Sequence, residues 1–183
     1  MRLFVGIPLA PTVIDELSKL ESHLRSKEDD LRWTQSETWH ITLQFLGSTT
    51  QQQYDCLIPR LSEIRSPHVP IRLQELGFFD QAGIFFADVK PAPALMVLQQ
   101  HVTAATAPCG FAHETRVYHP HITLARTKSK EGTQALRNLK TRTLNQPKFS
   151  VFMAESFVLY ESFTGPTGSR YEIRERFPLG SNS

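Results

Sequence analysis

A tetrapeptide, His-Ile-Thr-Leu, occurs twice in this chain of 183 residues and limits the folds it can adopt more than any other feature. The first copy begins at His40 and the second at His121, a spacing of 121 − 40 = 81 residues that is close to half the chain. Chance alone gives an expectation on the order of 0.2 for such a repeat in a chain of this length. The repeat is therefore informative mainly through its position, because both copies occupy the same place in a repeated order of predicted elements.

The first half is predicted to contain a strand over 3–8, a helix from Pro11 to Leu24, an extended segment over 33–46, a helix around 54–61, and strands over 69–76 and 84–89. The second half is predicted to contain a helix around 91–102, an extended segment over 118–126, a helix over about 130–140, and strands over 149–163 and 170–177. These predictions follow from apolar residues at helical or alternating spacing and from the Gly and Pro residues between them. Each half has the order helix, strand, helix, strand, strand, and one extra strand begins the chain.

An internal duplication of this kind predicts the architecture of the whole chain. We expect a single α+β domain over 1–183, made of two repeats of about 1–90 and 91–183. It should form two lobes related by a pseudo-twofold axis, each an antiparallel sheet with helices packed outside. The active cleft should lie between the lobes.

The repeated motif suits chemistry on a phosphodiester. Side chains alternate across a strand, so His40 and Thr42 should share one face, as should His121 and Thr123, while the intervening Ile and the Leu face the core. Two such strands related by a twofold axis bring two imidazoles and two hydroxyls to one cleft. Histidine can act as acid or base near neutral pH, and hydroxyls can donate to phosphoryl oxygens as negative charge builds up. This set requires no metal or other cofactor.

Composition excludes several other classes of protein. Hydrophobic residues make up 40% and charged residues 21%, with a net charge of only +2, which is typical of a globular protein and too small for a general nucleic-acid binder. Cys56 and Cys109 lie in no CxxC or Cys/His cluster, so neither a disulfide scaffold nor a structural zinc site is expected. With no signal peptide and no apolar run long enough for a bilayer, we expect a cytoplasmic monomer without membrane or protein partners.

The segments RLFVGIPL, WHITLQFLG and HPHITLAR, with the final strand pair, resemble the two-histidine (2H) phosphoesterases with paired HxTx motifs. Within them the chain is similar to the bacterial RNA 2',3'-cyclic phosphodiesterases, also called 2'-5' RNA ligases. The resemblance implies hydrolysis of an RNA-terminal 2',3'-cyclic phosphate to a 2'-phosphate, with 2'-5' ligation as the reverse reaction. It assigns His40 as proton donor and His121 as proton acceptor, and it gives phosphate binding to Thr42, Thr123 and Arg126. The implied partners are RNA ends or nucleotides that carry a 2',3'-cyclic phosphate.

The residue five positions after each histidine differs between the copies. Arg126 follows His121 at this offset, and Phe45 follows His40, so one copy offers a cation for a phosphate and the other a ring for base stacking. Strict alternation would turn both residues away from the histidines, so both assignments require a bulge or a strand end. Core packing is the alternative for Phe45.

Other polar residues near the second motif are open to two interpretations. His119 could share the face of His121, but Pro120 interrupts the strand, so a structural or positioning role is expected. Three further basic residues could contact RNA phosphates or form a solvated loop: Arg116, Lys128 and Lys130.

Three alternative functions share these residues. The first is other chemistry at the same centre, such as cleavage of 2',5' linkages, processing of RNA 3' ends, or opening of a small cyclic nucleotide. The second is a non-catalytic module that binds RNA ends, although binding alone does not need two titratable imidazoles. The third is a zinc hydrolase with His40, His119 and His121 as ligands, which lacks the carboxylate neighbours expected of such a site.

Overall fold

The computed structural model describes residues 1–25, 30–129, 133–143, 147–166 and 168–180. The helices are α1 (Pro11–Leu24), α2 (Gln51–Ser62), α3 (Pro93–Thr106) and α4 (Thr133–Arg142), with short 3₁₀ helices η1 (Ser36–Thr38), η2 (Asp80–Ala82) and η3 (Ala107–Cys109). The strands are β1 (Arg2–Pro8), β2 (Leu31–Trp33), β3 (His40–Ser48), β4 (Val69–Ile71), β5 (Leu73–Phe79), β6 (Ile84–Val89), β7 (His121–Thr127), β8 (Phe152–Ala154), β9 (Ser156–Gly165) and β10 (Gly168–Pro178).

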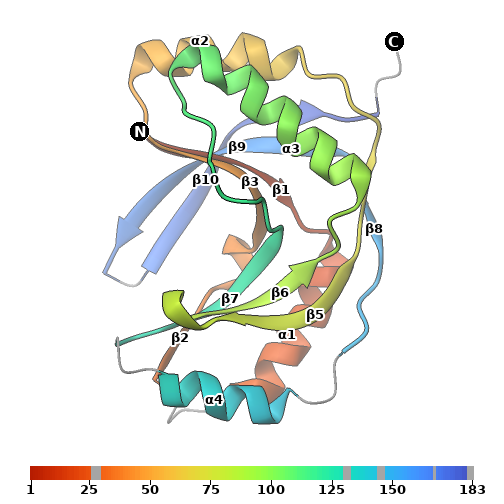
Figure 1. Cartoon of the computed structure of the whole chain (residues 1–183), viewed down its shortest axis with the longest axis vertical. Helices are drawn as coiled ribbons and strands as arrows, with labels where there is room; N and C mark the ends of the chain where they lie inside the picture. Colours follow the sequence, from red (N-terminus) through yellow and green to blue (C-terminus); the bar gives the residue numbers. More distant parts are fainter. Residues whose placement is uncertain (26–29, 130–132, 144–146, 167, 181–183) are drawn as a thin grey trace.

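Two antiparallel four-stranded sheets make up the two lobes. Sheet A has the strand order β10-β9-β1-β3, and sheet B has the order β2-β7-β6-β5. Figure 1 shows α2 and α3 beside sheet A at one end of the molecule, and α1 and α4 beside sheet B at the other. The predicted α+β class, with two antiparallel sheets and helices outside them, is confirmed. Within the described residues, no helix has the length and apolar character needed to cross a membrane.

Each lobe takes strands from both halves of the sequence. The hairpin β5–β6, from the first half, joins β7, whereas the hairpin β9–β10, from the second half, joins β1 and β3. The short strands β4 and β8, one from each half, pair with each other. The division into repeats of about 1–90 and 91–183 stays a prediction, but the two lobes are not the two halves of the chain. This exchange of strands brings β3 and β7 into contact between the lobes.

One continuous hydrophobic core runs through both lobes. Helix α1 buries Val13, Leu17 and Leu24, as its three- and four-residue spacing predicts. In the motif strands, the side chains of Ile41 and Ile122 are both 0% exposed. The apolar residues of the repeated motif therefore anchor β3 and β7 in the core, which leaves the opposite side of each strand for polar residues.

Several predicted extended segments are divided in the structure. The segment 33–46 contains η1, in which the Thr38 hydroxyl donates to the Gln35 carbonyl at 2.7 Å, so β3 begins only at His40. The segment 118–126 becomes a strand at His121, directly after Pro120, which has no N–H to pair. The segments 69–76 and 149–163 each supply a short strand to the β4–β8 pair before the longer strand joins its sheet. The predicted start of a helix near 130 lies outside the described residues.

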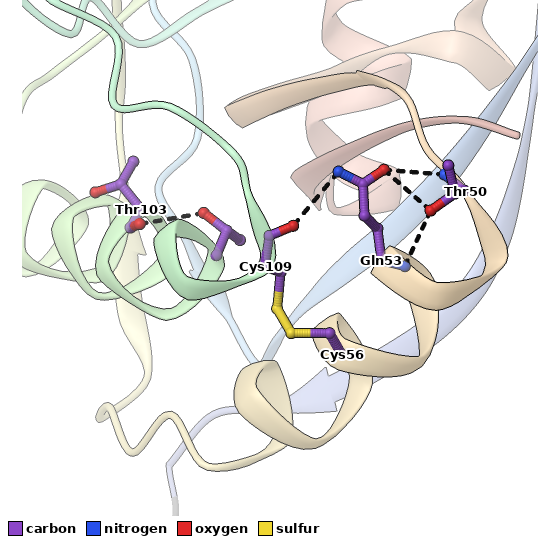
Figure 2. Close-up of a disulfide and its surroundings, with 6 residues drawn as sticks. Thr50, Gln53, Cys56, Thr103 and Cys109 are labelled. Atoms are coloured by element: carbon purple, nitrogen blue, oxygen red, sulfur yellow. Dashed lines mark hydrogen bonds between the residues drawn. A yellow bond between two sulfur atoms is a disulfide. The ribbon is translucent and has the colours of Figure 1, made fainter.

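No disulfide scaffold was expected, and the structure contains a single disulfide among the described residues that the sequence did not predict. Cys56 of α2 is bonded to Cys109 at the end of η3, with a Cα–Cα distance of 5.8 Å, and the Gln53 side chain donates to the Cys109 carbonyl at 3.4 Å (Figure 2). Gln53 also forms a capping box with Thr50 at the start of α2. The two cysteines are 53 residues apart, so no local motif could reveal their pairing. In the chain-entropy model, a loop of that length gives a stabilisation of about 4 kcal/mol.

Candidate active site

The two motif strands present their polar residues in the same way. Along β3 and along β7 the first four residues alternate between half-buried and buried, so both histidines and both threonines lie on the open side. His40, Thr42, His121 and Thr123 line one cavity of about 890 Å³. The structure therefore brings the four residues of the two motifs together, as the sequence predicts, at the junction of the two sheets.

A β-bulge at the last residue of each motif changes which side of the sheet the following residues face. In β3, Val5 pairs with Gln44 and Gly6 pairs with Thr42, so Leu43 is the extra residue. In β7, Phe85 pairs with Ala125 and Phe86 with Thr123, so Leu124 is the extra residue. The two bulges thus occupy the same position, the fourth residue of each tetrapeptide. An extra residue reverses the alternation that follows it.

The bulges explain why Phe45 and Arg126 face the cavity although each lies at an odd offset from its histidine. Both side chains line the same cavity as the two motifs, and Phe45 is 70% exposed. Core packing, the alternative considered for Phe45, is therefore wrong. Other residues that line the cavity include Thr34, Thr38, Gln44, Phe78, Phe79, Asp80, Arg116, Tyr118, His119 and Tyr171.

Both imidazoles are held by a carbonyl two residues earlier in the chain. The Nδ1–H of His40 donates to the Thr38 carbonyl at 2.7 Å, and that of His121 donates to the His119 carbonyl at 2.8 Å. A neutral histidine with the proton on Nδ1 has an unprotonated Nε2. The Nε2 of His40 accepts from the Thr42 hydroxyl at 3.0 Å. The Nε2 atoms are therefore the nitrogens available to exchange protons with a bound molecule.

An aromatic group surrounds His40 on sheet A. Its ring centroid lies 4.6 Å from that of Phe4, 5.3 Å from that of Tyr171 and 5.6 Å from that of Tyr160. Gly6 of β1 permits this approach, because an added Cβ would meet a backbone oxygen of β3 at 2.9 Å and the imidazole at 3.5 Å. The rings come from β1 and from the β9–β10 hairpin, far from His40 in the sequence, so no pattern within β3 reveals them.

His121 has a more polar environment on sheet B. Phe79 and Phe86 lie at centroid distances of 5.1 and 5.4 Å, and the His119 ring lies at 6.1 Å. The His119 Nε2–H donates to a carboxylate oxygen of Asp88 at 2.8 Å. His119 therefore has the positioning contact that the sequence favoured, through its carbonyl, and its ring forms a hydrogen bond with Asp88 that the sequence did not predict.

Burial lowers the pKa of both catalytic candidates. It holds the pKa of His40 at about 4, with smaller lowering effects from the charges of His121 and Arg126. Burial also lowers the pKa of His121, helped by His119 and Arg126 and opposed by the negative charge of Asp88. Without a bound anion both imidazoles are neutral near pH 7, and His40 is the harder of the two to protonate.

Each motif strand is also tied to a residue that precedes the other motif. The Thr34 hydroxyl, before the first motif, lies 2.9 Å from the carbonyls of Thr123 and Leu124 at the second bulge. The Tyr118 hydroxyl, before the second motif, donates to the Thr42 carbonyl at 2.8 Å. These reciprocal hydrogen bonds fix the spacing of the motifs across the cavity. Their sequence separations of 76 and 89 or 90 residues explain why sequence patterns did not reveal them.

The three further basic residues considered as RNA contacts differ in their position relative to the cavity. Arg116 lines the cavity, with a guanidinium nitrogen 3.8 Å from a Glu114 carboxylate oxygen. Lys128 is not among the residues that line the cavity, and Lys130 lies outside the described residues. Among the described residues, no cluster of three or more His, Cys, Asp or Glu side chains could hold a metal ion.

Two lobes that direct paired His-x-Thr strands into one cavity define the two-histidine class of phosphoesterases. A family model described as the 2'-5' RNA ligase superfamily matches residues 8–162 of the chain. The chain belongs to this superfamily.

Curated relatives from several organisms carry the name RNA 2',3'-cyclic phosphodiesterase. That of Bacillus subtilis is 32% identical over 132 residues, covering 67% of this chain and 69% of the relative. That of Methanocaldococcus jannaschii is 25% identical over 175 residues, covering 94% and 98%. That of Geobacillus stearothermophilus is 29% identical over 184 residues and covers 96% of this chain, but the chain spans only 56% of its length.

Solved structures share the fold over almost the entire chain. Escherichia coli LigT complexed with 3'-AMP superimposes with a TM-score of 0.83 at 24% identity, covering 98% of both chains. A protein of Thermus thermophilus, TT0787, superimposes with a TM-score of 0.76 at 23% identity, covering 100% of both chains. At these identities the likeness concerns the fold.

Proposed function

We propose that the protein hydrolyses an RNA-terminal 2',3'-cyclic phosphate to a 2'-phosphomonoester by two-histidine acid/base catalysis without a metal. The observation that carries this proposal is that two imidazoles, two threonine hydroxyls and one arginine line a single cavity, although they come from different sheets. The names of the relatives support an RNA substrate. The exposed ring of Phe45 supports a ligand that contains a base.

The reaction divides the proton transfers between the two sheets. The Nε2 of His121 takes a proton from water, and the water oxygen forms a new bond to phosphorus. The bond from phosphorus to the ribose 3'-oxygen breaks, and that oxygen takes a proton from the Nε2 of His40. Thr42 and Thr123 donate hydrogen bonds to the non-bridging oxygens, where Arg126 also stabilises the negative charge. The product keeps the phosphate on the 2'-oxygen.

The lowered pKa of His40 makes substrate binding a condition for its role as acid. At about 4, this pKa leaves the imidazole neutral in the empty site at pH 7. A bound phosphodiester anion raises the pKa of both histidines, and it also compensates the charge of Arg126, which lowers them. Since a donor must be protonated, we infer that His40 takes up its proton as the anionic substrate binds. The reverse reaction, 2'-5' ligation, would use the same groups in exchanged roles.

The test is incubation of the purified protein with EDTA and a short RNA that ends in a 2',3'-cyclic phosphate, with identification of the product isomer. We expect turnover to a 2'-phosphate at an undiminished rate. Loss of activity with EDTA and its recovery with zinc would replace this proposal with the zinc-hydrolase hypothesis. Tight binding without turnover would indicate the RNA-end binding module. Cleavage of internal 2',5' linkages in preference to the cyclic end would indicate the related phosphodiesterase chemistry.

We further propose that the protein is a cytoplasmic monomer. Its inferred substrate, an RNA end, supports a location in the cytoplasm. Disulfides are rare in reducing compartments, so we expect Cys56 and Cys109 to be thiols there. Cell fractionation with thiol labelling checks the compartment, and light scattering checks the monomer.

A further inference from the structure

A second cavity, of about 340 Å³, adjoins the candidate active site on sheet A. Phe45 and Tyr171 line both cavities, so the two cavities meet at these side chains. The volume lies near the lower limit of the roughly 300–1,000 Å³ usual for ligand sites. The reaction proposed above makes no use of this cavity.

The second cavity lies on the same face of sheet A as His40 and Thr42. Ser162 pairs with Tyr171, and Thr164 with Ser169, so these four side chains of β9 and β10 share a face. Phe4, buried in β1, forms the floor, with its ring centroid 4.9 Å from that of Tyr171 and 5.9 Å from that of Phe45. The opposite face of the sheet carries the core residues and packs against helices. The catalytic cavity and the second cavity are therefore two parts of one polar and aromatic surface.

The residues of the second cavity suit a nucleotide with a negatively charged phosphate. It is lined by Arg2 and by four residues that carry a hydroxyl, Ser162, Thr164, Ser169 and Tyr171. No carboxylate is among the described residues that line it. In the described part of the chain, no ion pair engages Arg2, so its charge is available to a ligand. Aromatic rings beside hydroxyls and a cation are the combination that binds single-stranded nucleic acid.

The proposed mechanism indicates which part of the substrate reaches this cavity. If His40 protonates the departing 3'-oxygen, the ribose must lie on the side of sheet A, with the attacking water on the side of His121. The nucleoside then extends from His40 toward Phe45. On the partner strand β1, Thr42, Phe45 and Gly47 lie opposite Gly6, Phe4 and Leu3. At about 3.3 Å per residue of β1, Phe45 therefore lies roughly 7 Å beyond Thr42, and Gly47, which lines the second cavity, roughly 10 Å beyond it.

We propose that the second cavity binds the nucleotide that precedes the cyclic-phosphate end of the RNA, with its internucleotide phosphate at Arg2. This inference rests on the proposed function, and it identifies the substrate as an oligonucleotide end rather than a free cyclic nucleotide. The internucleotide phosphate accepts hydrogen bonds from Arg2 and from the hydroxyls of the cavity. The base of this preceding nucleotide packs on the exposed ring of Phe45.

The experiment compares a 2',3'-cyclic mononucleotide with a dinucleotide that carries the same cyclic end. For the wild-type protein, we expect kcat/KM to be about tenfold or more higher for the dinucleotide, the worth of one charge-assisted hydrogen bond. Arg2→Glu should remove this preference and leave turnover of the mononucleotide unchanged. Thr164→Glu, in the same cavity, is a second variant that introduces a negative charge. Arg60→Glu, on α2, makes the same change of charge as Arg2→Glu outside both cavities and should retain the preference.

The results separate failure of the second site from failure of the proposed function. Equal kcat/KM for the two substrates in the wild type, or an unchanged preference in both Arg2→Glu and Thr164→Glu, would overturn the second site while leaving the hydrolysis intact. Absence of turnover for both substrates would overturn the function instead. The second site would then be decided by calorimetric binding of a 3'-phosphorylated dinucleotide and mononucleotide. Equal affinity would overturn it, and a dinucleotide preference lost in Arg2→Glu would support it.

Discussion

The His40 side and the His121 side of the cavity share a backbone plan and differ in their surroundings. Both motif strands have a bulge at the fourth residue, and both imidazoles donate from Nδ1 to a carbonyl two residues earlier. Around His40 there are aromatic rings from β1, β9 and β10, whereas His121 has the ion pair of His119 and Asp88 beside it. The shared backbone plan places two equivalent histidines at one cavity. Their different surroundings support the proposal that the two histidines perform different proton transfers.

The residues at offset five show the same division. Arg126, beside His121, supplies positive charge, and Phe45, beside His40, supplies an exposed ring. The equivalent bulges direct both into the cavity. In the proposed function, a phosphate therefore has its cationic partner on sheet B, and a base has its ring on sheet A. The two sides of the cavity are therefore chemically different, although the motif strands are related by pseudo-symmetry.

The largest expected effect tests what the two sides share. His40→Ala and His121→Ala should each reduce turnover of an RNA cyclic phosphate by about 10²–10⁴-fold, because each removes one proton-transfer group. Single-turnover assays with circular dichroism as a folding control measure this. Near-normal turnover by either variant would show that the two sides do not act together.

A smaller loss is expected at the threonines, where the sides should behave alike. Thr42→Val and Thr123→Val keep the β-branched shape and remove one donor each, so turnover should fall by up to about 10³-fold. The Thr42 hydroxyl also donates to His40, at 3.0 Å, whereas no equivalent hydrogen bond of Thr123 occurs within the described residues. The pH dependence of kcat/KM should therefore change in the Thr42 variant, and an identical change in both variants would contradict this difference.

His40 and His121 should contribute differently to the pH dependence of the free energy of unfolding. Burial holds the pKa of His40 at about 4 in the folded state, against 6.5 for a free imidazole, so between these values the unfolded chain binds the extra proton. The free energy of unfolding therefore does not depend on His40 above pH 6.5, and it decreases as the pH falls from 6.5 toward 4. The upper limit of this decrease in the free energy of unfolding is about 3 kcal/mol, and we expect a smaller value because the ring is partly exposed.

Urea unfolding of the wild type and of two variants at several pH values measures this effect. His40→Gln should flatten the curve between pH 6.5 and 4 more than His121→Gln does. A steeper or unchanged curve for His40→Gln would mean that its imidazole is not depressed in the folded state.

The smallest effect concerns the ion pair beside His121. The charge of Asp88 raises the pKa of His121, so Asp88→Asn should lower that pKa, which NMR titration of the His121 imidazole in the free protein measures. The pH titration of the His40 imidazole, followed by NMR, should stay in place, because Asp88 is not among the groups that shift its pKa. A shift in both imidazoles would show that the sides are electrostatically coupled through Asp88.

Sequence patterns predicted those features of the site that depend on local periodicity. The alternation of His, Ile, Thr and Leu was enough to assign two residues of each motif to the cavity and two to the core. The offset of Phe45 and Arg126 required a bulge between each motif histidine and these residues, and the structure has one at the fourth residue of each motif. The order of helices and strands was likewise predictable, since apolar spacing reports on each element separately.

Features that depend on long-range pairing could not be predicted in this way. The exchange of hairpins between the lobes, the Cys56–Cys109 bond and the hydrogen bonds of Thr34 and Tyr118 join segments far apart in the sequence. A pattern within one strand does not identify its neighbour in the sheet. The aromatic group around His40 illustrates this, because its rings come from three strands that only the tertiary fold brings together.

The central claim is that the two histidines carry out opposite proton transfers, and a change of leaving group tests it most directly. Nitrophenolate leaves without protonation, so a nitrophenyl phosphodiester still needs a base but no acid. We expect this substrate to restore turnover of His40→Ala toward the wild-type rate while His121→Ala stays poor. Equal rescue of both variants, or rescue of His121→Ala alone, would contradict the assigned roles.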